Sequence, residues 1–212
     1  MIYYKNGAKL MRPVSSREEY VGLRNKPANV EYTAAARLGN PEAKRRMLQF
    51  NYSCLPTAEN KLKGATTPSN SVGMDIDFAK DMSKNELESA MKIMIGRVLN
   101  MKDDLGLLML ERSASKGLHV VFKRIGWLTQ EENLEWAQKM LGVEFDKGAK
   151  DITRVFFTPT ADENDLIYLS DQLFENVESA LSDRKVVKQP TAGGVKAHHL
   201  AVAQSRLNVF KK

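Results

Sequence analysis

Cysteine is almost absent from this chain of 212 residues, which contains one, Cys54. A single cysteine excludes an internal disulfide framework and a zinc site built from several cysteines. No uncharged run is long enough to cross a bilayer, and no basic segment leads into the apolar stretch of a secretory signal. We therefore expect a globular protein of the cytoplasm that has no membrane partner.

Several common catalytic signatures are missing as well. There is no G-x-x-x-x-G-K-[ST] phosphate loop, and the isolated Gly73 and Gly106 form no G-x-G-x-x-G dinucleotide fingerprint. Neither an H-E-x-x-H zinc motif nor a G-x-S-x-G elbow around Ser113 or Ser115 is present. The sequence is therefore not that of a P-loop NTPase or a zincin, and the two serines lack the setting of an acyl-transfer nucleophile.

The charge of the chain is biased toward basic residues. It has 32 Lys and Arg against 26 Asp and Glu, a formal net charge of +6. Many of the basic residues precede residue 71, and others lie near the C-terminal end. This excess is compatible with a polyanionic partner, and equally with a soluble basic surface that has no such partner.

Two aspartates separated by one residue mark the centre of the chain. Alternation over residues 72–78 predicts a strand with Val72, Met74 and other apolar residues on one face. Asp75 and Asp77 then share the opposite face, where neighbouring carboxylates repel unless a cation, an arginine or solvent neutralises them. Hard cations such as Mg²⁺ often bind one or two carboxylates together with substrate phosphates. The pair indicates a divalent-metal site or a solvated strand edge.

The remaining pattern predicts an alternation of strands and helices. Capping signals at Ser16–Glu19, Asn40-Pro41, Ser83–Glu86 and Thr129–Glu132 predict helix starts. Short apolar runs predict strands at 105–110, 118–123, 154–158 and 166–169, and a last helix is predicted from about Asp171. The central order is β-α-β-β-α-β-β, so we expect an α/β protein of the α+β type, with a sheet covered by helices.

Three regions follow from this pattern. Residues 1–70 are expected to be a basic, mainly helical region packed on the core. Residues 71–183 are expected to form the main domain. Residues 184–212, which follow a Pro- and Gly-containing stretch, are expected to be a linker or C-terminal arm.

The turn of the predicted hairpin carries groups that suit a phosphate. Hydroxyls, an ammonium, an imidazole and the backbone N–H groups around a glycine are all donors to phosphate oxygens. They come from Ser113, Ser115, Lys116, Gly117 and His119. His119 is the only histidine outside the C-terminal region, and a single histidine can equally be structural.

Acidic and basic residues also follow the third capped helix. Asp146 is a possible third carboxylate for a metal site, and the planar guanidinium of Arg154 is suited to a triphosphate. Asp151 lies between them and is interpreted first as the cap of a loop.

These motifs, in this order, resemble the archaeo-eukaryotic primase superfamily. The relevant features are a strand ending in Asp75-x-Asp77, a helix, a hairpin with Ser113-x-x-x-Gly117-x-His119, and Asp146 followed by Arg154. More narrowly, residues 20–170 are similar to primase-like domains encoded near mobile elements and prophages of Bacteroidetes. The resemblance implies an RRM-like palm over residues 71–183, in which three carboxylates bind two Mg²⁺ or Mn²⁺ ions.

The resemblance also assigns roles to individual residues. Asp75, Asp77 and Asp146 match the catalytic, metal-binding acids, and Asp151 is the alternative third acid. The nucleotide-binding residues would be Ser113, Ser115, Lys116, Gly117, His119 and Arg154. The chain departs from many relatives because Phe156-Phe157-Thr158-Pro159 replaces their Arg-x-Pro segment after the third motif, and because it has no zinc-binding Cys/His stem.

The activity implied by the resemblance is that of a DNA primase/polymerase in the replication of a mobile element or phage. It would transfer nucleoside triphosphates onto a 3′-hydroxyl on a single-stranded DNA template, which the basic N-terminal region would follow. Because relatives often continue into a helicase, a helicase is a possible partner. Two alternatives stay open, namely a non-catalytic DNA-binding replication or mobilisation module and a metal-dependent nuclease.

Overall fold

The computed structural model describes residues 2–5, 9–79 and 81–175. The predicted 184–212 arm, and the part of the last predicted helix beyond Glu175, lie outside these residues. Among the helices of the described ranges, none combines the length and apolar composition needed to cross a membrane.

The described residues form two four-stranded sheets in which every neighbouring pair of strands is antiparallel. The first sheet has the order β2 (Arg12–Val14), β1 (Ile2–Lys5), β3 (Gln49–Asn51) and β7 (Phe156–Phe157). The second has the order β4 (Ser71–Asp77), β6 (Gly117–Lys123), β5 (Leu107–Arg112) and β8 (Leu166–Leu169).

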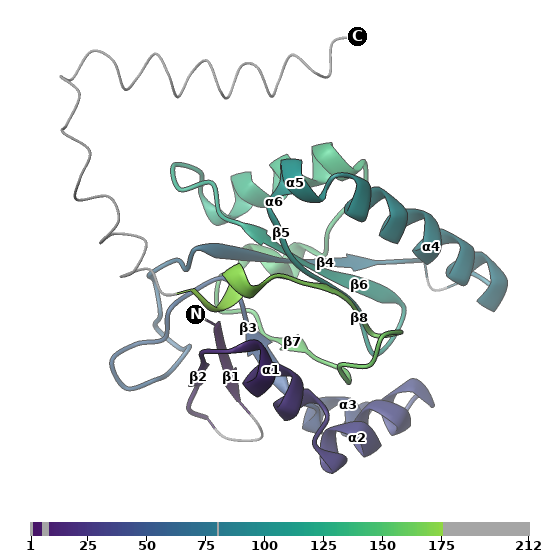
Figure 1. Ribbon diagram of the computed structural model, residues 1–212, viewed down its shortest axis with the longest axis horizontal. Helices are drawn as coiled ribbons and strands as arrows, with labels where there is room; N and C mark the ends of the chain where they lie inside the picture. The colour runs from purple at the N-terminus through teal and green to yellow at the C-terminus, as the bar shows by residue number, and fades with distance from the viewer. Residues whose placement is uncertain (1, 6–8, 80, 176–212) are drawn as a thin grey trace, which may run out of the picture. The chain divides into compact units, whose positions relative to one another are not determined.

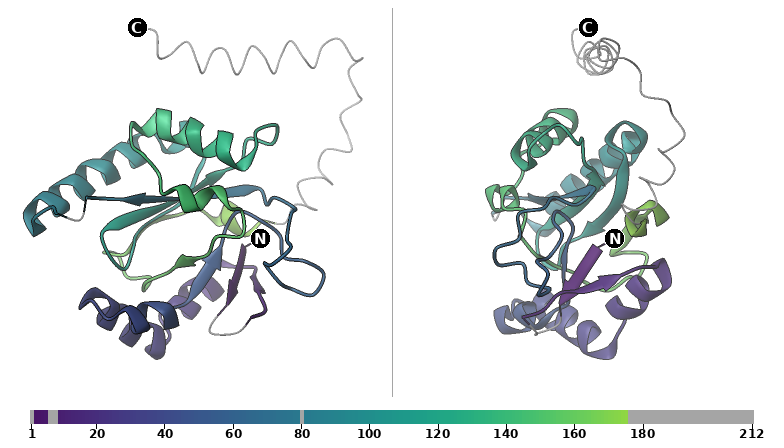
Figure 2. Two further views of the ribbon diagram at one scale, coloured as in Figure 1. Left: turned by 180° about the vertical axis from the view of Figure 1, so that it is seen from behind. Right: turned by 90° about the vertical axis from the view of Figure 1, so that its left-hand side faces the viewer.

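Helices surround these sheets on two sides. Near the N-terminus are α1 (Arg17–Arg24), α2 (Pro27–Arg37) and α3 (Pro41–Arg46), and later in the chain are α4 (Lys84–Asn100), α5 (Lys102–Leu105) and α6 (Gln130–Leu141). Short 3₁₀ turns occupy Lys147–Lys150 (η1) and Asp171–Phe174 (η2). Figure 1 shows α4, α5 and α6 on one side of the molecule and α1, α2 and α3 on the other, with the strands between, and Figure 2 shows the same layers from behind and from the side.

Each face of the second sheet has its own hydrophobic core. Val72, Met74 and Ile76 of β4 are fully buried in the core formed with α4 and α6. The opposite face contributes Val121 of β6 to a second core, which includes Phe50 of the first sheet together with α1 residues. The β4 alternation predicted from sequence is therefore confirmed, and it directs the odd-numbered residues of β4 toward the N-terminal layer.

The expected α+β class is confirmed, and so are the capped helix starts. The side chains of Ser16, Asn40, Ser83 and Thr129 each accept a hydrogen bond from a backbone N–H of the first turn that follows. Ser83 and Thr129 form complete capping boxes with Glu86 and Glu132.

The N-terminal region contains more strand than the sequence pattern predicted. Residues 1–70 contribute β1, β2 and β3, each of three or four residues, which is too short for a period-two signal. The strand predicted at 154–158 is observed as β7, but it pairs with β3 and so belongs to the first sheet. The strand predicted from Leu105 begins at Leu107, because Leu105 ends α5 and Gly106 follows in the left-handed conformation with φ 62°.

The edge of the second sheet beside β4 explains how the site is assembled. The order β4-α4-β5-β6-α6 is that of a split βαβ arrangement, in which the last strand would lie next to β4. Here β8 lies next to β5 instead. The segment after α6 lies along β4, and the Asp146 N–H donates to the carbonyl of Asp75 at 2.8 Å.

Candidate functional site

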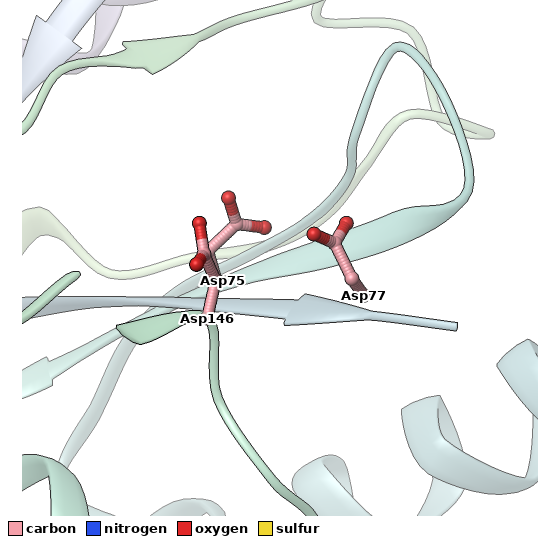
Figure 3. A group of neighbouring side chains, drawn as sticks. All are labelled: Asp75, Asp77 and Asp146. Carbon is pink, nitrogen blue, oxygen red and sulfur yellow. The ribbon is translucent and has the colours of Figure 1, made fainter. Parts of the chain in front are cut away.

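Three aspartates meet at this edge. Asp75 and Asp77 point from β4 to the side away from α4 and α6, and Asp146 reaches the same place from the segment alongside (Figure 3). One carboxylate oxygen of each lies within 4.8 Å of the others. The Asp146 carboxylate also accepts the Gly148 N–H at 3.1 Å, which fixes the start of η1. Two predicted acids on one strand and one on a neighbouring segment therefore form a single cluster.

The cluster fits a hard divalent cation by its donor set and by its charge. Its ligand atoms are all carboxylate oxygens, the donors that Mg²⁺ and Mn²⁺ prefer. Burial raises the pKa of Asp75 above its usual value. The charges of His119 and Arg154 lower this pKa, whereas those of Asp77 and Asp146 raise it. Burial has the largest effect, and the pKa of Asp75 remains raised. The ionised form of Asp75 is thus disfavoured mainly by its burial, and a divalent cation bound to the cluster would favour it.

Arg154 supplies part of the countercharge. Its Nη2 lies 2.8 Å from Oδ2 of Asp146 and 3.6 Å from Oδ2 of Asp75. The side chain is more than a third exposed, so these ion pairs lie at the border between the sheet and solvent. A guanidinium in this position can neutralise the acids or turn to an incoming anion.

A row of three ionisable side chains crosses the sheet from the cluster. The register pairs Asp75 of β4 with His119 of β6, and His119 with Glu111 of β5. His119 Nδ1 lies 2.6 Å from Oε1 of Glu111, and His119 Nε2 lies 3.8 Å from Oδ1 of Asp75. Burial lowers the pKa of His119, but the hydrogen bond and charge of Glu111, with the charge of Asp75, outweigh it and leave the pKa raised.

Asp75, Asp77 and His119 border a cleft of about 120 Å³. Its other walls come from the hairpin turn, from α3 and from the segment around β7, and include Lys44, Ser113, Ser115, Arg154, Phe156 and Phe157. Lys44 Nζ lies 3.0 Å from Oγ of Ser115 and 5.9 Å from the centre of the Phe157 ring. The cleft thus brings carboxylates together with hydroxyl and cationic donors.

Most of the predicted site residues are brought together. Asp75, Asp77, Ser113, Ser115, His119 and Arg154 line the cleft, and Asp146 joins the acid cluster. Gly117 lies where β4 and β6 approach closely, because a Cβ there would meet the carbonyl oxygen of Ile76 at 2.5 Å.

Two predicted residues have other positions. The side chain of Lys116 is exposed and is not among the described residues that line the cleft. Its backbone carbonyl accepts a hydrogen bond from the Phe78 N–H. Asp151 Oδ1 accepts both the N–H and the hydroxyl of Thr153 at 2.8 Å, as expected for a loop cap. The geometry therefore groups Asp146, rather than Asp151, with Asp75 and Asp77.

Three residues around the cleft were not singled out from sequence. Lys44 belongs to a basic run on α3, and Arg24 ends α1, so nothing local distinguished them. Glu111 is the last residue but one of β5, and the hairpin register would have placed it opposite His119. The hairpin register was therefore the one feature of the sequence that could have identified Glu111 as a neighbour of His119.

No protein family matches this chain, and comparisons with curated proteins and with solved structures give no match either.

Proposed function

We propose that this protein is a nucleotidyltransferase of the DNA primase/polymerase type, acting on nucleoside triphosphates and a single-stranded DNA template. The observation that carries the proposal is the shared cleft. Asp75 and Asp77, two of the three clustered carboxylates, line one small cavity together with a set of phosphate donors, and Asp146 lies beside them.

The acid cluster would hold the metal ions. Asp75, Asp77 and Asp146 offer the ligands, and bound Mg²⁺ or Mn²⁺ would activate the attacking 3′-hydroxyl and neutralise charge on the leaving pyrophosphate. The chain itself supplies binding and orientation. The half-buried position of Asp75 keeps part of the cluster away from bulk water, which strengthens its electrostatic interactions.

The donors that line the cleft would bind the triphosphate. Lys44 and the hydroxyls of Ser113 and Ser115 offer donors at the cleft, and His119 directs Nε2 toward it. Arg154 pairs with Asp146, and its guanidinium would be able to turn from that carboxylate to a triphosphate. The cleft is smaller than the roughly 300–1,000 Å³ typical of whole-ligand pockets, so it suits the phosphates, with the nucleoside at its mouth.

One observation favours a second candidate, a non-catalytic DNA-binding module. Arg154 already neutralises part of the acid cluster, as a structural ion pair would. A metal-dependent nuclease would use the same acids, but it gives no reason for the Lys44 and Ser115 contact at the cleft.

The test is synthesis of oligonucleotides from labelled nucleotides on single-stranded DNA with Mn²⁺ or Mg²⁺. The Asp75→Ala/Asp77→Ala variant should lose at least about 100-fold in rate. Asp146→Ala should lose a similar factor, whereas Asp151→Ala is the matched control and should keep the parent rate.

The alternatives give different results in the same assay. A binding module would make no product, and the acid variants would bind DNA as the parent does. A nuclease would degrade the DNA with metal and without added nucleotide.

A further inference from the structure

We propose that the buried ion pair of Arg24 and Glu111 is a positioning pair that holds the imidazole of His119 with Nε2 toward the cleft. The inference rests on the proposed function, because there the imidazole meets a phosphate group. Neither Arg24 nor Glu111 lines the cleft in the described structure, so both would act through His119.

Glu111 fixes which ring nitrogen faces the cleft. A carboxylate only accepts hydrogen bonds, so the 2.6 Å contact requires a hydrogen on Nδ1 of His119. Nε2 is then the nitrogen on the side of Asp75, at 3.8 Å from its carboxylate. Phe156 meets the imidazole edge to face with ring centres 5.1 Å apart, which restricts rotation of the ring. Glu111, which does not line the cleft, and Phe156, which does, therefore set the orientation of His119 together.

Arg24 makes a buried carboxylate tolerable at this position. Its Nη2 lies 2.8 Å from Oε2 of Glu111, and both side chains are completely buried. The guanidinium is held in turn by the carbonyl oxygens of Pro159 and Thr160 and by the hydroxyl of Tyr20. A charge buried without such a partner would be strongly destabilising.

Stability alone does not explain why the ion pair of Arg24 and Glu111 is buried. Within the described residues, Oε2 of Glu111 receives no well-directed hydrogen bond, although it lies beside the Arg24 charge. Buried ion pairs are often no more stable than apolar residues of similar volume. Contact with His119 gives the pair a role that apolar residues could not fill, since leucine or methionine cannot accept from Nδ1.

The test replaces the whole pair, so that neither charge is left alone in the core. Arg24→Met/Glu111→Met leaves the carbonyl oxygens of Pro159 and Thr160 without their donor, so its urea midpoint should fall, and binding is measured under conditions in which the variant is folded. We expect affinity for inorganic triphosphate with Mn²⁺ to fall at least about tenfold, and KM for nucleotide to rise more than kcat falls. Arg37→Met/Asp165→Asn is the matched control, because it removes an ion pair elsewhere without leaving a buried charge alone, and it should leave both values unchanged.

A direct readout of the ring separates positioning from stability. In proteins whose His198 and His199 are replaced by asparagine, ¹⁵N NMR at a pH where the imidazole of His119 is neutral should show hydrogen on Nδ1 in the parent and a mixture of tautomers in the double variant. If the double variant does not fold, Glu111→Gln serves instead. Its amide oxygen should face Arg24 and its NH₂ group should face Nδ1, which moves the hydrogen to Nε2.

The outcomes are distinct. An unchanged tautomer in both variants overturns the inference, and so does a changed tautomer with parental affinity for triphosphate. If the parent itself neither binds triphosphate nor makes product, the proposed function fails, while a changed tautomer would still support the orientation of His119 by Glu111.

Discussion

Asp75 carries an electrostatic penalty when no metal is bound. Its folded-state pKa is raised, chiefly by burial, above the usual 3.8. A carboxyl group whose pKa is raised on folding stabilises the folded state at pH values below its pKa in the unfolded chain. That stabilisation is lost as the pH rises through its pKa in the folded state. We expect Asp75→Asn to be more stable than the metal-free parent at pH 7, by a margin that narrows toward pH 4. Urea midpoints in a chelating buffer measure this, and a variant less stable than the parent at pH 7 would contradict it.

Lys44 and Arg45 are neighbours with different expected effects. Lys44 lines the cleft and contacts Ser115, whereas Arg45 is exposed and pairs with Glu42 on its own helix. Lys44→Ala should weaken the binding of nucleoside triphosphate about tenfold, equivalent to about 1.4 kcal/mol. Arg45→Ala should change it less than about twofold, because exposed ion pairs contribute little. Calorimetric titration compares the two, and equal losses would indicate that general surface charge binds the nucleotide.

The sequence was informative about residues that act through short motifs. The spacing of Asp75 and Asp77 on one strand correctly placed them on the face opposite the apolar residues of that strand. It could not locate Arg24 beside Glu111, because that contact joins α1 to β5 across the second core. Such buried partners of a site residue depend on tertiary packing, which leaves no periodic signal.

At the scale of elements, the close approach of β4 and β6 is directly testable. Gly117→Ala would place a Cβ 2.5 Å from the Ile76 carbonyl oxygen, so the strands must separate next to Asp77. We expect a loss of about 1–3 kcal/mol in the free energy of unfolding. Gly96→Ala in α4 is the control, since no atom lies within 4 Å of its added Cβ, and it should gain about 0.5–1 kcal/mol. Urea unfolding measures both, and similar effects would contradict the contact.

The two kinds of element differed in how well local sequence predicted them. Helix starts were confirmed because a cap is a local hydrogen bond, as between Ser83 and the Glu86 N–H. The sheet to which β7 belongs was not predictable in this way. It pairs with β3, a distant segment, and pairing partners are set by the whole fold.

At the scale of the molecule, the cleft is bounded by both sheets. Asp75 comes from the second sheet, whereas Phe156 and Phe157 come from the first. A ligand bound here would stabilise both layers together, by about 2.7 kcal/mol at a hundred times its Kd. We expect Mn²⁺ with a non-hydrolysable nucleotide to raise the melting temperature of the parent and to leave that of Asp75→Ala/Asp77→Ala nearly unchanged. Equal shifts in thermal denaturation would place the ligand elsewhere.

The pairing of β3 with β7 also has a consequence for the order of folding. Phe50 lies opposite Phe156, so this sheet is completed only after a long intervening segment has been brought back. Closing such a loop costs entropy before the contact is gained, which makes late formation the expected course. During synthesis, one edge of β3 would remain unpaired until β7 had emerged from the ribosome. The wall formed by Arg154, Phe156 and Phe157 would then be among the last parts of the cleft to form, after the paired strands that carry Asp75 and His119.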